Sequence, residues 1–227
     1  MCANEFRHDP GGCFGTKGAK MTIRQTYAPK DFHLLGLTGI SDRTLDMHYA
    51  LYKGYVKHTN LLSEQLAEMI HKKQALSANP AYSELKRHLG FEYGGMILHE
   101  YYFLALAPKG AGEPSKELRR AINECFGSFP EWMADFTSVG NMRGVGWAVL
   151  YQDPVTGGLS NHWIALHDQG VPPSFKPLLV MDMWEHAYML DYSPSNKQVY
   201  IESFQSNINW NAVNHWLANL AADRLAA

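Results

Sequence analysis

The sequence predicts an α+β fold, in which an N-terminal antiparallel helical hairpin precedes a C-terminal α/β domain with a small three-stranded antiparallel sheet. Apolar residues recur at helical spacing over residues 45–70 and again beyond residue 80, and residues 77–80 interrupt the pattern. Short apolar runs separated by turn residues begin only after residue 143. We therefore expect a disordered tail at residues 1–26, a helical hairpin domain at 27–110 and an α+β domain at 111–227.

Composition excludes several classes of function. The formal net charge is -2 and the lysines and arginines are scattered, so no nucleic-acid partner is expected. No run approaches the roughly 20 apolar residues that span a bilayer, so no membrane partner is expected. The 3 cysteines are an odd number without close pairing, which favours a reducing compartment. We expect a cytoplasmic protein.

The first long helix carries an imidazole and two phenols on one face. Ser41 or Asp42 supplies the signal for its start. His48, Tyr52 and Tyr55 follow at i, i+4 and i+7, which places them on the same side of the helix. By itself, His48 fits a hydrogen-bonded core histidine better than a metal ligand.

The second helix is expected over residues 81–107 and contains an unusual pair of glycines. Gly94 and Gly95 are costly in a helix unless another group approaches closely. His99 follows among aromatic residues. An antiparallel hairpin of two such helices can bring His48 opposite His99.

The C-terminal part begins with two shorter helices, at residues 115–125 and 129–139. Strands are expected at residues 144–151, 163–167 and 178–182, with a turn at 153–158 between the first two. Helices at residues 197–207 and 209–225 close the chain.

The end of the third strand carries the most informative motif. Asp182 stands where the strand stops, and His186 lies one helical turn later, so both side chains can face one point. A carboxylate with imidazoles suits manganese, iron or zinc. Alternatively, Asp182 caps the following turn and His186 is a buried, hydrogen-bonded histidine.

Around this motif the sequence resembles the iron/manganese superoxide dismutase family. Residues 182–188 read Asp-Met-Trp-Glu-His-Ala-Tyr and match the family signature Asp-x-Trp-Glu-His-Ala-Tyr at every fixed position. Other blocks match around His48, around His99 and at Trp147. The resemblance implies one iron or manganese ion per subunit, which converts superoxide to dioxygen and hydrogen peroxide. It assigns four metal ligands: His48, His99, Asp182 and His186.

The resemblance also implies two catalytic residues beside the ion. Tyr55 is similar to the family's tyrosine over the open face, although it stands seven residues after His48, one fewer than usual. We interpret this as a deletion that removes a helical irregularity and keeps Tyr55 near the site. Gly95 occupies one position from which a glutamine can bond the metal-bound solvent, so the donor is expected from the loop after the second strand. His167 is favoured there over Gln169, and an imidazole can titrate near neutrality.

Further residues are placed by the same resemblance. Four aromatic side chains are expected to line the cavity: Tyr102, Phe103, Trp147 and Trp184. Glu185 is expected to reach the metal-binding histidine of a second subunit in a homodimer or a dimer of dimers. Tyr52 stands where the family has an interface histidine, and Met189 replaces that histidine's partner, so we place Tyr52 at the interface without the usual hydrogen bond.

Two alternatives use the same ligands. A zinc-dependent hydrolase can be built on three histidines and a carboxylate, although no free carboxylate base stands beside the ligands in the sequence. A non-catalytic metal-binding protein would have no need of Tyr55 or His167.

Overall fold

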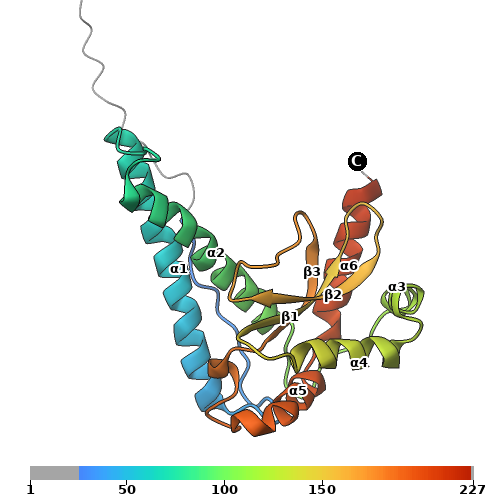
Figure 1. Ribbon diagram of the computed structural model, residues 1–227. Helices are drawn as coiled ribbons and strands as arrows, with labels where there is room; N and C mark the ends of the chain where they lie inside the picture. The colour runs from blue at the N-terminus through green and yellow to red at the C-terminus, as the bar shows by residue number, and fades with distance from the viewer. Residues whose placement is uncertain (1–25, 226–227) are drawn as a thin grey trace, which may run out of the picture.

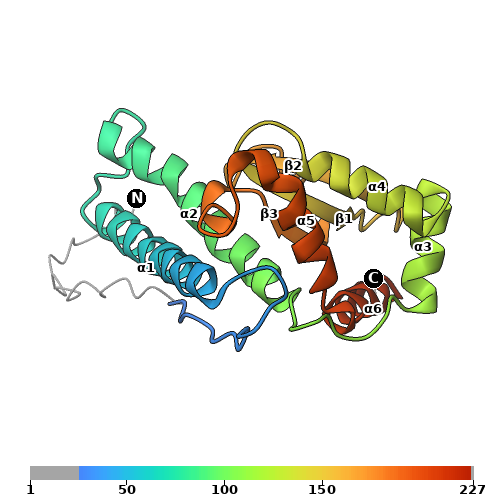
Figure 2. The same ribbon diagram turned by 90° about the horizontal axis from the view of Figure 1, so that it is seen from below.

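The computed structural model describes residues 26–225, so the tail predicted at residues 1–26 lies almost entirely outside the described residues. Helices α1 (Asp42–His71) and α2 (Pro80–Leu104) form the hairpin and lie side by side in both ribbon views (Figures 1 and 2). Ser41 caps α1 by accepting a hydrogen bond from the Thr44 backbone N–H, and Asn79 caps α2 through Ala81 in the same way.

The sheet contains three antiparallel strands in the order β2-β1-β3. They are β1 (Gly146–Gln152), β2 (Leu159–Ala165) and β3 (Lys176–Asp182). The central strand β1 is buried along its whole length, and β3 is buried from Leu178 onward. Trp147 pairs with Asp182 across β1 and β3, so the register places an indole next to the carboxylate at the end of the sheet.

The remaining helices surround the sheet. They are α3 (Lys116–Phe126), α4 (Phe129–Gly140), α5 (Lys197–Ser206) and α6 (Trp210–Leu225). Figure 1 shows α3 and α4 on the side of the sheet away from the hairpin, while α2 contacts β3. Two short 3-10 helices, η1 (Glu185–Ala187) and η2 (Pro194–Asn196), follow β3. The predicted α+β class is confirmed.

Several predicted bounds differ from the structure by a few residues, and three differences concern elements that carry site residues. Helix α2 ends at Leu104 rather than at residue 107. Strand β2 ends at Ala165, so His167 lies in a turn that is closed by paired hydrogen bonds between Ala165 and Gln169. The turn that carries His186 is a 3-10 helix. In each case local backbone bonding ends or tightens an element that apolar periodicity alone would extend.

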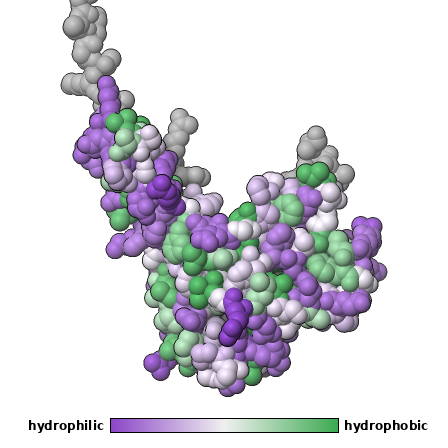
Figure 3. Space-filling model, viewed as in Figure 1, coloured by the Kyte–Doolittle hydropathy of each residue, from purple (hydrophilic) through white to green (hydrophobic). Residues whose placement is uncertain are grey.

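Helix α2 is buried chiefly at the end that meets the sheet, whereas α1 has buried residues from Thr44 to Leu66. In α2 the buried residues all fall between Glu92 and Phe103. The opposite end of the hairpin has a predominantly hydrophilic surface in Figure 3. In the part of the chain that the structure describes, no helix is both long enough and apolar enough to cross a membrane.

Candidate metal centre

Four side chains from separate elements converge at the junction of hairpin and sheet. His48 comes from α1, His99 from α2, Asp182 from the end of β3 and His186 from η1. Each can offer one ligand atom, and these atoms all lie within 4.8 Å of one another. The first three side chains are buried, and His186 is partly buried. The arrangement is a compact set of three imidazoles around one carboxylate.

Asp182 uses its two carboxylate oxygens differently. Oδ1 accepts a hydrogen bond of 2.8 Å from the Trp184 backbone N–H. Oδ2 lies 3.0 Å from Nε2 of His48 and 3.0 Å from Nε2 of His186. Asp182 therefore holds the backbone before η1 with one oxygen and faces the imidazoles with the other, but it does not cap η1, whose N-cap is Trp184 without a side-chain cap hydrogen bond.

His99 is held in the orientation that a metal ligand requires. Its Nδ1 donates a hydrogen bond of 2.6 Å to the Gly95 carbonyl, which leaves Nε2 as the unprotonated nitrogen. Nε2 is buried without a hydrogen-bond partner and lies 3.7 Å from Asp182 Oδ2. A buried nitrogen without a partner is costly, and a bound metal ion would satisfy it.

The electrostatic state of the cluster also fits a metal ion. Burial lowers the pKa of His48 and lowers that of His99 well below its usual value. Burial opposes ionisation of Asp182, but attraction and hydrogen bonds from His186 and His48 outweigh it and hold its pKa well below the usual range. Neutral imidazoles with an ionised carboxylate are the forms that bind metal. Such a donor set fits a first-row transition ion.

A chain of hydrogen bonds lies beside the four ligands. The Trp147 indole N–H donates to His167 Nδ1 at 3.0 Å, and His167 Nε2 lies 2.8 Å from the Tyr55 hydroxyl. Because an indole can only donate, neutral His167 carries its proton on Nε2 and donates it to Tyr55. Tyr55 therefore accepts from His167, and its own O–H is free for another acceptor.

The sequence of this chain matches those of known proteins. Residues 114–216 match the family model described as "Iron/manganese superoxide dismutases, C-terminal domain". The superoxide dismutase [Fe] of Aquifex aeolicus is 38% identical over 191 residues, covering 82% of this chain and 88% of that protein. The chain belongs to the iron/manganese superoxide dismutase family.

Relatives named for manganese, or for both metals, are nearly as identical in sequence to this chain as the relative named for iron. The superoxide dismutase [Mn] of Mycolicibacterium smegmatis is 34% identical over 184 residues, or 79% of this chain and 85% of that protein. The superoxide dismutase [Mn/Fe] of Propionibacterium freudenreichii subsp. shermanii is 34% identical over 178 residues, or 77% of this chain and 86% of that protein. The family resemblance drawn from residues 182–188 is thus confirmed over most of the chain.

The helix that carries the first histidine of the cluster is regular. Helix α1 runs without interruption from Asp42 to His71. Tyr55 remains close to the cluster, with its ring centroid 5.1 Å from that of His99. The shorter spacing between His48 and Tyr55 therefore places both side chains on one face of a continuous helix.

The two candidate donors in the loop after β2 differ in position. His167 is only 1% exposed and reaches Tyr55, whereas Gln169 is exposed. Leu166 precedes His167 in the left-handed region, with φ of 53°, and this strained backbone turns the imidazole inward. Burial lowers the pKa of His167 from 6.5 to about 4, so the expectation that it titrates near neutrality is wrong for this environment.

The paired glycines of α2 make room for this arrangement. A Cβ atom at Gly94 would lie 2.3 Å from the His167 carbonyl oxygen. A Cβ atom at Gly95 would lie 2.7 Å from Cδ1 of the Tyr55 ring. The sequence predicted that another group approaches these two glycines closely. The groups are His167 at Gly94 and Tyr55 at Gly95.

Aromatic rings enclose the centre. Tyr102 and Phe103 lie against His48, with ring centroids 4.9 and 5.0 Å from it. Trp184 stacks on His167 at 4.7 Å. These rings, together with Trp147, replace water around the ligands with apolar surface.

Sequence reasoning missed two residues of this shell. The Phe91 ring lies 4.6 Å from His167 and also faces Tyr55. Phe91 stands eight residues before His99 on the same face of α2, and this spacing could have predicted that the ring lies near the cluster. Tyr200 donates a hydrogen bond of 2.7 Å to the Asp182 backbone carbonyl. It comes from α5, and no local spacing in the sequence connects it to the site.

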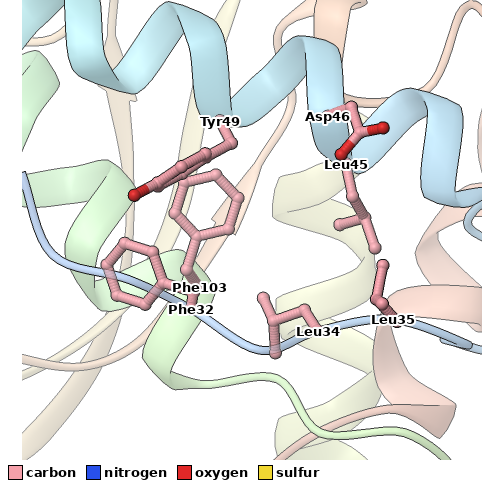
Figure 4. A pocket seen from close by; sticks show the side chains of 7 residues that line it. All are labelled: Phe32, Leu34, Leu35, Leu45, Asp46, Tyr49 and Phe103. Atoms are coloured by element: carbon pink, nitrogen blue, oxygen red, sulfur yellow. The ribbon is translucent and has the colours of Figure 1, made fainter.

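A small pocket lies on the outer side of Phe103 (Figure 4). The Phe103 and Tyr49 rings stand in its wall, and Phe103 also packs on His48. Its lining is otherwise mostly apolar and is contributed by α1 and the segment before it: Phe32, Leu34, Leu35, Leu45 and Asp46. The Phe103 ring therefore lies between His48 and this pocket.

The two residues expected at a dimer interface differ in exposure. Tyr52 is 0% exposed, and its hydroxyl donates to Glu100 and accepts from the Lys30 backbone N–H. The expectation that Tyr52 lies at the interface is therefore wrong, since a second subunit finds no Tyr52 surface to contact. The tyrosine instead packs against the segment before α1, through Phe32. Glu185 is exposed beside the partly exposed His186.

Proposed function

We propose that this protein is a superoxide dismutase that converts two superoxide anions and two protons into dioxygen and hydrogen peroxide. The convergence of His48, His99, Asp182 and His186 next to the Tyr55–His167 pair carries this proposal. These four residues would hold one iron or manganese ion per subunit. Such an ion supplies one-electron redox chemistry, because both metals exchange between divalent and trivalent states.

The protein's own contribution to proton transfer lies in Tyr55 and His167. Burial, followed by the charges of Asp182 and Glu92, raises the pKa of Tyr55 above its ordinary value, so the phenol stays protonated at neutral pH. His167 orients that phenol by donating to its oxygen. We propose that the Tyr55 O–H delivers protons toward the peroxide that forms, and that His167 positions it.

The surrounding rings restrict what reaches the centre. Phe91, Trp184 and Phe103 lie against His167 or His48, so only a small molecule can approach the ligands. A small anion such as superoxide satisfies this limit. The charge on a metal ion held by three neutral imidazoles and one carboxylate favours an anion over a neutral molecule of the same size.

The choice between iron and manganese is left open by the donor set, because both ions accept the same ligands. The relatives named for iron, for manganese and for both metals are 34–38% identical to this chain. Catalysis is favoured over simple metal storage or zinc-dependent hydrolysis by the partly buried Tyr55–His167 hydrogen bond, for which neither alternative has a use.

We further propose that the protein assembles as a homodimer or a dimer of dimers. The exposed Glu185 carboxylate, next to His186, supports a reciprocal contact with the His186 of a second subunit. A reducing, cytoplasmic location is supported by the odd number of cysteines, of which Cys125 is a free thiol.

The proposed activity is tested by following superoxide consumption in stopped-flow measurements. The purified metal-containing protein is compared with Asp182→Ala, which removes the carboxylate that faces all three imidazoles. We expect rapid superoxide loss with hydrogen peroxide formation in the original protein, and loss of both metal and activity in the variant. A metal-loaded original protein that leaves superoxide at the uncatalysed rate would refute the proposal.

A further inference from the structure

A second group of metal-binding side chains lies on the hairpin, outside the four-residue cluster. Glu92 on α2 is almost completely buried, with a side chain 7% exposed. His88, one turn earlier on the same helix, places Nε2 at 2.9 Å from Glu92 Oε1. His58 on α1 places Nδ1 at 3.6 Å from the same oxygen.

The Glu92 carboxylate faces two imidazoles. Within the described residues, no lysine or arginine nitrogen lies within 4.0 Å of it, and the two imidazoles are the groups that face it. A buried carboxylate is costly unless a cation or several donors compensate it. The groups that face the carboxylate are imidazole nitrogens and not a lysine or arginine, and a metal cation held between the three side chains would compensate its charge.

We propose that Glu92, His88 and His58 bind a divalent transition-metal ion. Two imidazoles and one carboxylate are a donor set that zinc and other first-row ions accept. His88 and Glu92 are four residues apart on one helix, a spacing that lets both point at one ion.

The distances suit such an ion. Tetrahedral zinc with bonds of about 2.0–2.1 Å separates its ligand atoms by about 3.3 Å. Both nitrogen to Oε1 distances, 2.9 and 3.6 Å, are close to this value. Among the described residues, only His48, His99, Asp182 and His186 stand ready as a complete ligand set, so the two imidazoles of the second site have to move to complete it. Their side-chain exposures of 47% and 55% leave them room to do so.

The site is separate from the dismutase cluster but adjacent to it. His58 lies three residues after Tyr55 on α1, and the His88 ring stacks on Phe91, which in turn packs on His167. An ion at Glu92 would therefore bind the two hairpin helices together next to the Tyr55–His167 pair. This inference does not depend on the proposed dismutase activity, because it concerns binding only.

The test uses protein already loaded with iron or manganese and zinc as the probe. After equilibrium dialysis against Zn²⁺, zinc and the resident metal are both measured in the same sample. We expect one additional zinc per chain with no loss of the resident metal, and loss of that zinc in His88→Ala, His58→Ala and Glu92→Gln. Since His88 and His58 are exposed, their variants should keep the resident metal and the unfolding temperature.

His71→Ala is the matched control, because it removes another exposed histidine from α1, at the end of the helix. It should keep the additional zinc. Zinc that is absent from the original protein, that is gained only as the resident metal is lost, or that persists in both His88→Ala and His58→Ala would overturn the proposal.

Discussion

The Tyr55 hydroxyl lies 2.8 Å from His167 Nε2, although 112 residues separate the two positions. The bond joins α1 of the hairpin to the turn after β2. The Trp147 indole N–H, on β1, donates to the other imidazole nitrogen, Nδ1 of His167. The proton of neutral His167 therefore lies on Nε2, which faces Tyr55. Proton handling at the proposed metal centre therefore depends on the relative position of the hairpin and the sheet.

Tyr55→Phe removes only the phenolic oxygen from this arrangement. We expect the variant to retain metal, since Tyr55 is not a ligand, and to lose turnover by on the order of tenfold or more because its proton donor is gone. Turnover at high superoxide concentration and metal content are the two measurements. Unchanged turnover in a fully loaded variant would show that the hydroxyl has no role.

His167 is expected to tolerate glutamine better than alanine. Glutamine can accept from the Trp147 indole and donate to Tyr55, whereas alanine leaves the buried indole N–H unpaired at a cost of about 1–3 kcal/mol. We expect His167→Gln to recover most of the turnover and thermal stability that His167→Ala loses. Gln169→Ala is the control, since Gln169 is exposed, and an effect there as large as at His167 would reassign the donor.

Gly95→Ala places a methyl group against the Tyr55 ring, closer than van der Waals contact allows. The contact of 2.7 Å leaves no room, so we expect a loss of about 1–3 kcal/mol in the free energy of unfolding together with lower turnover. Gly54→Ala on α1 is the matched change, because its Cβ meets nothing within 4 Å. It should stabilise the protein by about 0.5–1 kcal/mol, through helix propensity alone. If Gly95→Ala and Gly54→Ala changed the free energy of unfolding in urea by the same amount, the steric explanation would be contradicted.

Acidification should destabilise the metal-free protein. Burial lowers the pKa of His48, His99 and His167 from 6.5, in the last case to about 4. The unfolded chain therefore takes up protons below pH 6.5 that the folded chain does not, so stability is full above that value and falls as the pH decreases. The urea midpoint should fall between neutral pH and about pH 4, and less steeply in His167→Gln. A midpoint independent of pH over this range would contradict the buried, neutral state of these histidines.

The sequence predicts the parts of this fold that depend on local pattern. Helical periodicity identifies the face of α1 that carries His48 and Tyr55, and the apolar run before Asp182 identifies β3. The motif at residues 182–188 matches the family signature at every fixed position, so it indicated the centre from the sequence alone. Gly94 and Gly95 predicted a close approach without indicating what approaches.

The rest depends on contacts between distant residues. Tyr200 supports Asp182 through a bond from α5, and nothing near either residue in the sequence points to it. Tyr52 was placed by analogy with an interface histidine, but its longer phenol reaches Glu100 inside the chain. The pKa of His167 depends on how deeply the left-handed turn at Leu166 buries the imidazole, which composition cannot reveal.

Removal of the bound metal and reconstitution with iron, manganese or zinc, each followed by a dismutase assay, tests the account most directly. We predict one ion at the cluster of His48, His99, Asp182 and His186 in every case, and dismutase activity with iron or manganese but not with zinc, which cannot change its oxidation state. Full occupancy by iron and by manganese without superoxide turnover in either form, or equal turnover with zinc, would contradict it.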